Sequence, residues 1–182
     1  MKQIVAVGII LILFAVGLSG CTQEDALSGL GYSNRYYGFG LNPPKGWTVQ
    51  GKNTSSATVA SFLCSSASES EVKIIIFEPA TLDGETLDSG VELTLGFYSN
   101  ALPNYSLISE NARSVNGMNA YEIVFNCTNC FYVENEELEI KIKEVFVEKN
   151  GMVFIIHYSA TPDAYDTYLS IVEQSINSFT IV

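Results

Sequence analysis

Short runs of alternating apolar and polar residues fill the chain from residue 36 onward, and this two-residue period is typical of β-strands. Turn-forming residues separate the runs. Asn42–Gly46 holds two prolines, and the Asn-Gly pairs at 116–117 and 150–151 favour tight hairpin turns. The pattern predicts strands at residues 37–41, 47–49, 57–64, 72–77, 106–115, 119–126, 138–143, 152–160 and 179–182.

The strand that begins at residue 138 alternates apolar residues with the charged residues Glu139, Lys141 and Lys143. Successive side chains of a strand point to opposite faces of the sheet. We therefore expect this strand to have one solvent-exposed face.

Two segments have the helical period of three to four residues instead. In residues 86–102, Asp88 or Ser89 is placed to cap the start of the helix, and Pro103 ends it. In the second segment, Pro162 takes the first helical position, where its missing N–H costs nothing. The apolar stripes consist of Leu87, Val91, Leu95, Tyr98 and Leu102 in the first helix and of Tyr165, Leu169, Val172 and Ile176 in the second. The pattern predicts an α+β fold, with an antiparallel β-sheet and helices packed against its faces.

The first twenty residues differ from the rest of the chain. Residues 4–18 are apolar or small and uncharged, which is short for a permanent membrane span but suits the apolar stretch of a secretory signal. Leu18-Ser19-Gly20-Cys21 follows and resembles the lipobox of membrane lipoproteins. The resemblance implies that residues 1–20 are a cleaved signal peptide and that Cys21 carries a lipid; an uncleaved helix that happens to end in cysteine is the alternative. We expect residues 21–35 to be a tether and residues 36–182 to be the folded domain.

Composition and charge narrow the class of protein. The chain has 182 residues, 47% of them hydrophobic, which is enough for one folded domain with a core of its own. It carries 20 Asp and Glu against 9 Lys and Arg, a formal net charge of -11. Nucleic acid and anionic lipid surfaces require clustered basic residues, so the charge argues against both as partners.

Cys127 and Cys130 are the most suggestive chemical feature. Outside the cytoplasm a disulfide is the first interpretation, and the residues between the two cysteines would then have to turn, for which Asn129 is suited. Free thiols, a redox-active pair and a metal site are the alternatives. A tetrahedral zinc site would need Cys64 and His157 as well, and their spacing does not support one. We expect Cys64 and His157 to be core residues, and we predict neither a metal site nor a cofactor.

Two other sets of residues have possible surface roles. Asn53, Asn104 and Asn126 each begin an Asn-x-Ser/Thr glycosylation sequon, which leads to the hypothesis of a glycosylated archaeal envelope protein. An acidic cluster lacks the glycine at the bend of a calcium loop, so we interpret it as a solvated loop. The cluster consists of Glu134, Glu136, Glu137 and Glu139.

Several motifs of the folded domain together resemble the PsbP family, whose superfamily includes the extrinsic photosystem II subunit and a Ran-binding nuclear import factor. They are Tyr37-x-Phe39, Pro44-x-Gly46-Trp47, Val145–Val147, Gly151, Val153–Tyr158 and the closing helix with Phe179. The resemblance implies an antiparallel sheet between helices and a role in binding or assembly rather than catalysis. It transfers no metal-binding or partner-binding residue.

We therefore expect a non-enzymatic lipoprotein on the extracytoplasmic face of the cell membrane, which binds or assembles with an envelope partner that the sequence does not identify. One alternative is a small-ligand-binding lipoprotein in which Trp47, Tyr36 and Tyr37 line a cleft. Another is a thiol-redox protein that uses Cys127 and Cys130.

Overall fold

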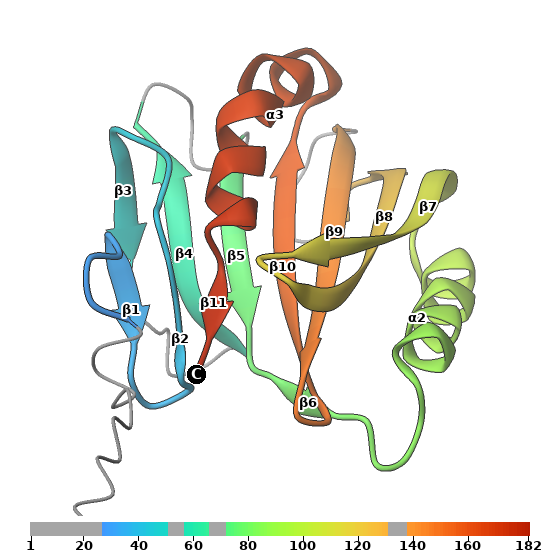
Figure 1. Ribbon diagram of the computed structural model, residues 1–182. Coiled ribbons are helices and arrows are strands. Elements are labelled where there is room, and N and C mark those ends of the chain that lie inside the picture. The colour runs from blue at the N-terminus through green and yellow to red at the C-terminus, as the bar shows by residue number, and fades with distance from the viewer. Residues whose placement is uncertain (1–26, 51–56, 66–71, 131–137) are drawn as a thin grey trace, which may run out of the picture.

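The computed structural model describes residues 27–50, 57–65, 72–130 and 138–182. These residues form an antiparallel sheet of eight strands, a smaller antiparallel sheet of three strands and two helices (Figure 1). The strands are β1 (Tyr32–Asn34), β2 (Phe39–Leu41), β3 (Trp47–Gln50), β4 (Thr58–Cys64), β5 (Val72–Phe77), β6 (Ala80–Thr81), β7 (Ser106–Val115), β8 (Met118–Thr128), β9 (Glu139–Lys149), β10 (Met152–Ala160) and β11 (Thr180–Ile181), and the helices are α2 (Leu87–Ala101) and α3 (Pro162–Asn177). The predicted α+β class is confirmed.

The large sheet has the strand order β3-β4-β5-β10-β9-β8-β7, with β6 paired to β10, and the small sheet has the order β1-β2-β11. Tight hairpins join the longest strands. Asn116-Gly117 connects β7 to β8 and Asn150-Gly151 connects β9 to β10, and all four residues have positive φ angles of 47° to 77°. Both positions of a type I′ turn need such angles, so the two predicted hairpin turns are confirmed.

The two helices cover opposite faces of the large sheet. Val145 and Val147 of β9 belong to the larger of two hydrophobic cores, whereas Phe146 between them belongs to the smaller one. Helix α3 packs against β5, β9 and β10 on the face of the larger core, and α2 packs against β8 and β9 on the other face. Figure 1 shows α3 in front of the centre of the sheet and α2 at its β7 side.

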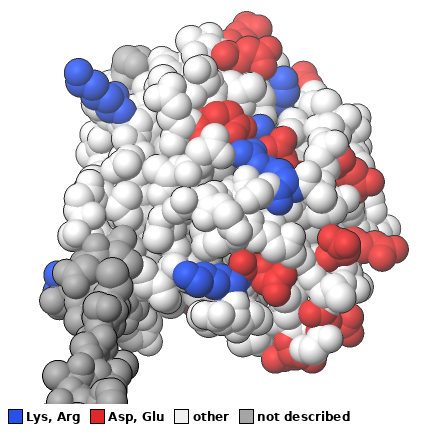
Figure 2. Space-filling model, in the orientation of Figure 1, with Lys and Arg blue, Asp and Glu red and all other residues white. Residues whose placement is uncertain are grey.

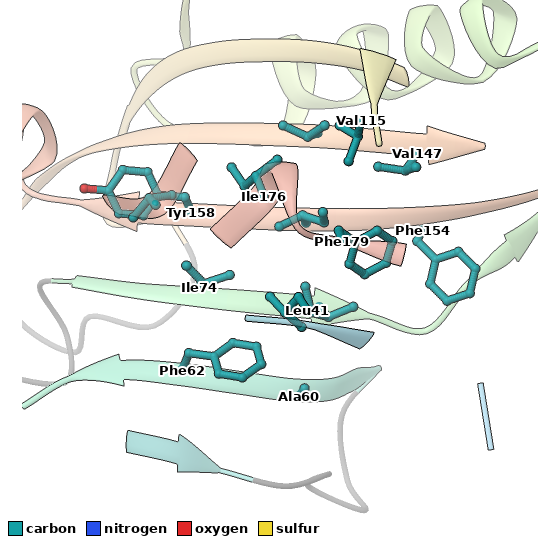
Figure 3. Packing of buried hydrophobic residues seen from close by; sticks show 14 of the residues in the cluster. Leu41, Ala60, Phe62, Ile74, Val115, Val147, Phe154, Tyr158, Ile176 and Phe179 are labelled. Carbon is teal, nitrogen blue, oxygen red and sulfur yellow. The ribbon is translucent and has the colours of Figure 1, made fainter. Parts of the chain in front are cut away.

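The larger core is built around aromatic rings from three different segments. Phe39 of β2 lies 5.7 Å from the ring of Phe154 in β10 and 5.5 Å from that of Phe179, which follows α3. Phe154 and Phe179 are themselves 5.8 Å apart, and none of the three is solvent-exposed. Figure 3 shows Phe62 of β4 and Ile176 of α3 among the side chains of the same core. The small sheet and α3 are thereby fixed to one face of the large sheet.

The folded domain begins before the predicted boundary at Tyr36. Tyr32–Asn34 pairs with Phe39–Leu41 as strand β1, and Leu27 is buried with 6% exposure. A side chain on Gly40 would lie 2.7 Å from the side chain of Leu30, so β2 needs glycine where this segment crosses it. The last residues of the tether predicted for residues 21–35 therefore belong to the folded domain. Residues 1–26 lie outside the described part of the chain.

Two local predictions also need correction. The first predicted strand, which is β2 in the structure, starts at Phe39 rather than Tyr37, because the chain turns at Gly38, whose N–H donates to the Asn34 carbonyl at 2.9 Å. Helix α2 is capped by Thr86, whose hydroxyl oxygen accepts the Ser89 N–H at 3.2 Å, and not by Asp88 or Ser89.

The face of β9 predicted to be solvent-exposed lies largely under α3. The side chain of Lys143 is only 8% exposed and forms ion pairs with Glu122 of β8 at 3.1 Å and with Glu173 of α3. Arg113 of β7 also pairs with both carboxylates, at 3.1 Å in the case of Glu173. The charged residues of β9 are thus neutralised by ion pairs, in part with the helix that covers them, rather than solvated. Of the charged residues predicted to face solvent, only Glu139 is exposed.

Candidate interaction surface

Helix α2 is fixed to the sheet by one apolar stripe and one polar contact. Leu87 and Val91 are buried with 4% and 2% exposure against the smaller core. One turn before the end of the helix, the Tyr98 hydroxyl donates to Glu144 Oε2 of β9 at 2.9 Å. These contacts fix the rotation of the helix about its axis, and so determine which of its residues point outward.

The Tyr98 contact belongs to a buried polar network. Glu144 and His157 are directly opposite each other on β9 and β10, and Glu144 Oε1 lies 2.9 Å from His157 Nδ1. Both side chains are 1% exposed, and the ring of Phe77 packs against the imidazole at 5.7 Å. Burial, and then the neighbouring Glu144 carboxylate, raise the pKa of Tyr98 well above its ordinary value, so its hydroxyl remains a donor. His157 is a packed and hydrogen-bonded core residue, as expected.

The opposite side of α2 exposes large apolar residues. Leu93 is 71% exposed and Phe97, one turn further along, is 65% exposed. Leu93 borders an open surface depression of about 740 Å³ along the helix. We define the α2 outer face as Glu85, Ser89, Glu92, Leu93, Gly96, Phe97 and Asn100.

Nothing within the described chain covers the centre of the α2 outer face. A Cβ atom on Gly96 would meet no atom within 4 Å, so internal packing does not require glycine there. Glycine inside a helix costs about 1 kcal/mol relative to alanine. The helix therefore has a small residue at an open position where its own stability would favour a larger one.

The charge around this face has one sign. Residues 79–112 contain five acidic residues and no lysine or arginine. The acidic residues are Asp83, Glu85, Asp88, Glu92 and Glu110. Figure 2 shows acidic side chains gathering along the edge of the molecule where α2 lies. A partner surface that complements this region is apolar at its centre and basic around it.

Edge strand β7 adds a second exposed apolar pair. Leu107 is 40% exposed and Ile108 is 52% exposed. Leu107 is opposite Phe125, whose ring lies 5.2 Å from that of Tyr98, so Leu107 is on the same sheet face as α2. A register shift at Ile108 interrupts the pairing of β7, as bulges often do at the edges of sheets.

The disulfide expected between Cys127 and Cys130 is present in the structure, with the two Cα atoms 5.9 Å apart. Asn129 between them has a φ angle of 51°, so it makes the turn that the short bridge requires. Its side-chain oxygen accepts the Leu138 N–H at 2.9 Å, and its own N–H donates to the Leu138 carbonyl at 3.0 Å. The bridge thus closes the turn at the end of β8, and Asn129 in this turn is hydrogen-bonded to Leu138, the residue before β9.

The environment of the disulfide does not favour the redox alternative. Cys127 has no exposed surface and Cys130 is 5% exposed, within the smaller core. Thiol–disulfide exchange needs access of an attacking thiolate to one sulfur. The pair also lies at the end of a strand, whereas low-pKa thiols are typical of helix N-termini.

The two described sequons are in different environments. Asn104 is exposed, and its side-chain amide donates to Thr128 Oγ1 at 3.2 Å. Asn126 is half-buried within β8, and its amide donates to Glu139 Oε1 at 2.9 Å. Asn104 is therefore the more accessible acceptor. Asn53 lies outside the described residues, as do Cys21, Glu134, Glu136 and Glu137.

The three aromatic residues predicted to line one cleft do not lie together. Trp47 is opposite Cys64 at one end of β4. The Tyr37 hydroxyl donates to Glu78, and the Glu78 N–H donates to the carbonyl of Ala57, next to the other end of β4. Tyr36 lies beside Tyr37 and is 87% exposed. The length of β4, about 20 Å, separates the two groups. The predicted cleft formed by Trp47, Tyr36 and Tyr37 is wrong.

Cys64 and His157 also lie apart, on opposite faces of the sheet. Cys64 is buried in the larger core, whereas His157 faces the smaller core. Within the described ranges there is no group of three or more histidine, cysteine or acidic residues that could hold a metal ion. The helices described are also too short or too polar to cross a membrane.

Sequence reasoning did not identify the α2 outer face, although the sequence contains the necessary signal. Leu93 and Phe97 fall outside the apolar stripe of Leu87, Val91 and Leu95, on the far side of the helix. A second group of large apolar residues on an otherwise amphipathic helix indicates a surface that is covered by something else.

Comparisons with known proteins agree with this fold. The model of the family described as PsbP-like protein matches residues 19–181. Cyanobacterial PsbP from Synechocystis is 19% identical, with a TM-score of 0.57 over 83% of this chain and 91% of that one. LpqN, which is involved in cell envelope biogenesis of Mycobacterium tuberculosis, is 17% identical, with a TM-score of 0.58 over 79% of this chain and 83% of that one.

The Ran-binding protein Mog1p of Saccharomyces cerevisiae is also similar in structure. It is 11% identical, with a TM-score of 0.54 over 80% of this chain and 90% of that one. Identities this low show a shared fold alone. A comparison with curated proteins gives no match.

Proposed function

Because the chain belongs to the PsbP-like protein family, we propose that it is a non-enzymatic binding module held at the outer face of the cell membrane by a lipid on Cys21. Its partner is an envelope protein that docks on the α2 outer face. The single observation that carries the proposal is the pair Leu93 and Phe97, exposed on a helix within a stretch, residues 79–112, that holds five acidic and no basic residues.

Two features of the chain support attachment to the membrane. An uncharged apolar stretch of 15 residues, Ile4–Leu18, precedes Ser19-Gly20-Cys21, the residue types that a lipoprotein signal requires. Five residues separate Cys21 from Leu27, the first buried side chain among the described residues. Such a spacing holds the domain close to the membrane surface.

The fold supports a binding role at the envelope. LpqN shares the fold and is involved in cell envelope biogenesis, and Mog1p shares it and binds Ran. Glu144 and His157, which are buried in the described domain, are bound to each other and are each only 1% exposed. A catalytic acid or base must be within hydrogen-bond reach of its substrate. Binding therefore suits this domain better than catalysis.

Lipid attachment is tested by the mass and location of the native protein. We expect the native chain to lack residues 1–20, to carry lipid on Cys21 and to fractionate with membranes. The variant Cys21→Ser should be found in the medium or as the uncleaved precursor. A membrane-bound Cys21→Ser protein of unchanged mass would contradict lipid attachment.

Docking on α2 is tested by purifying the protein from its own envelope after mild crosslinking. The wild type should yield one crosslinked complex of fixed size. Leu93→Asp with Phe97→Asp should abolish it, because aspartate disrupts the apolar centre of the surface. The matched control is Ser170→Asp with Gln174→Asp on exposed positions of α3, which adds the same charge elsewhere and should leave the complex intact.

The acidic surroundings make a separate prediction about the same complex. Glu85→Lys with Glu92→Lys should weaken it, and higher salt should weaken the wild-type complex while affecting the variant less. A complex that tolerates both pairs of α2 substitutions would place the binding surface elsewhere on the protein.

A further inference from the structure

A surface pocket lies on the other side of the molecule, between the start of β3 and the middle of α3. Its volume is about 340 Å³, at the small end of the range for ligand pockets. The side chains that line it are Lys45, Trp47, Cys64, Ser65, Tyr168 and Ile171. They come from the Pro-rich turn, the end of β4 and two successive turns of α3.

Local structure holds the walls of this pocket in place. Gly46 has a φ angle of 84°, and the Trp47 N–H closes the turn by donating to the Pro44 carbonyl at 3.1 Å. The Ser65 hydroxyl donates to the Gly46 carbonyl at 2.9 Å, which ties the turn to the end of β4. The indole of Trp47 packs edge-on against the ring of Tyr168 at 6.1 Å. The pocket is therefore preformed rather than a gap between mobile side chains.

The pocket has mostly apolar walls, and one lysine lies at its rim. Trp47, Tyr168 and the 37%-exposed Ile171 offer ring and methyl surface. Lys45 is exposed at the rim, and no carboxylate in the described ranges forms an ion pair with it. Arg113, Lys141 and Lys143, by contrast, are each paired with acidic side chains.

We propose that this pocket binds a small amphipathic anion, an organic molecule with a flat apolar body and one carboxylate, sulfonate or phosphate group. The apolar body packs against Trp47, Tyr168 and Ile171, and the anionic group faces the Lys45 ammonium. The chain has a net charge of -11, so a cation that no described carboxylate pairs with, beside an aromatic pocket, gives this site a local charge opposite in sign to that of the whole protein. This site is separate from the α2 outer face and does not depend on the partner proposed above.

Trp47 is the only tryptophan of the chain, so its fluorescence reports directly on this pocket. The test titrates the full chain with 2-naphthoate and with 2-naphthamide, which have the same ring system but differ in charge. Both should change the fluorescence of Trp47, and 2-naphthoate should bind about fivefold more tightly, the upper limit for an exposed ion pair.

Substitutions separate the basic rim from the apolar wall. Lys45→Gln should remove the preference for 2-naphthoate and leave the affinity for 2-naphthamide unchanged. Lys141→Gln removes an equal charge elsewhere on the surface and should preserve the preference. Ile171→Asp should weaken both ligands at least tenfold, with the circular dichroism spectrum of the wild type retained.

Three results would each overturn the proposal. The first is a Trp47 fluorescence that responds to neither compound at millimolar concentration. The second is equal affinity for the two compounds in the wild type, and the third is a preference that Lys45→Gln and Lys141→Gln alter to the same extent. The comparison of the two ligands needs no variant, so it holds even if a substitution affects folding.

Discussion

The two faces of the large sheet are covered by one helix each, but the two helices serve different purposes. Helix α3 closes the larger core: Val172 and Ile176 have no exposed surface, and Phe179 directly after the helix is also fully buried. Its polar side is tied to the sheet as well, through ion pairs of Glu173 with Arg113 and Lys143. Both the apolar side of this helix and Glu173 on its polar side hold the fold together.

Helix α2 rests on a smaller core and has fewer ties. A buried network through Tyr98 and Glu144 fixes it, and the disulfide of Cys127 lies beneath it. Its far side exposes Leu93 and Phe97, which make no contribution to the core. The difference indicates that the α3 face determines the fold and that the α2 face is available for binding. The following changes should affect the two faces unequally.

The largest loss of stability should come from the α3 face. Phe179→Ala removes a fully buried ring that contacts Phe39 and Phe154, and should lower the free energy of unfolding by about 3–5 kcal/mol. Leu93→Ala on α2 should change it by less than about 0.5 kcal/mol, because that side chain is mostly exposed. Urea unfolding of both variants measures the contrast; equal losses would contradict it.

Removal of the disulfide should have a smaller effect. Cys127→Ser with Cys130→Ser should cost about 2 kcal/mol, the value expected for closing so short a loop in the unfolded chain. The wild type in reductant should lose a similar amount in urea unfolding. Hydrogen exchange should show that the loss of protection is larger in α2 and β8 than in α3, and uniform loss would argue against separate cores.

Tyr98→Phe tests the polar tie of α2. The substitution leaves Glu144 Oε2 without the Tyr98 donor and should cost about 1–1.5 kcal/mol. Amide hydrogens of α2 should exchange faster while those of α3 are unaffected. Tyr36→Phe is the matched control, since Tyr36 is 87% exposed, and it should leave both stability and exchange unchanged.

The ion pairs of α3 make a prediction about pH. Burial on its own raises the pKa of Glu173, but hydrogen bonds and charge from Lys143 and Arg113 outweigh it and hold the pKa below its ordinary value. A carboxyl with a lowered pKa stabilises the fold above its unfolded pKa of about 4.3, and this contribution is lost as pH falls through the folded value. Glu173→Gln should therefore flatten the fall in stability below about pH 4.5, as measured by urea unfolding.

Much of the fold could be predicted from the sequence because local chemistry decides it. The Asn-Gly turns need positive φ angles, and Pro162 fits the first position of α3, where its missing N–H needs no partner. The turn at Asn129 likewise follows from the short spacing of Cys127 and Cys130. Each of these features depends on neighbours in the chain rather than on distant contacts.

Features that depend on distant contacts could not be predicted. The charged residues of β9 have the sequence pattern of a solvent-exposed face. In the structure, Glu173, 30 residues away in sequence, lies over Lys143 and pairs with it. Strand β1 carries no alternation of its own and exists because Gly40 permits a close approach. Trp47 forms a pocket with Tyr168 rather than with Tyr36 and Tyr37, because β4 separates the latter pair from it.

The central claim, that α2 is the binding face, is tested most directly by a photo-activated crosslinking residue placed at position 97 in cells, with position 174 of α3 as the control. The claim predicts one adduct of fixed size from position 97, none of that size from position 174, and loss of the adduct when Leu93→Asp is added. The same adduct from both positions, or one from position 174 alone, would contradict it.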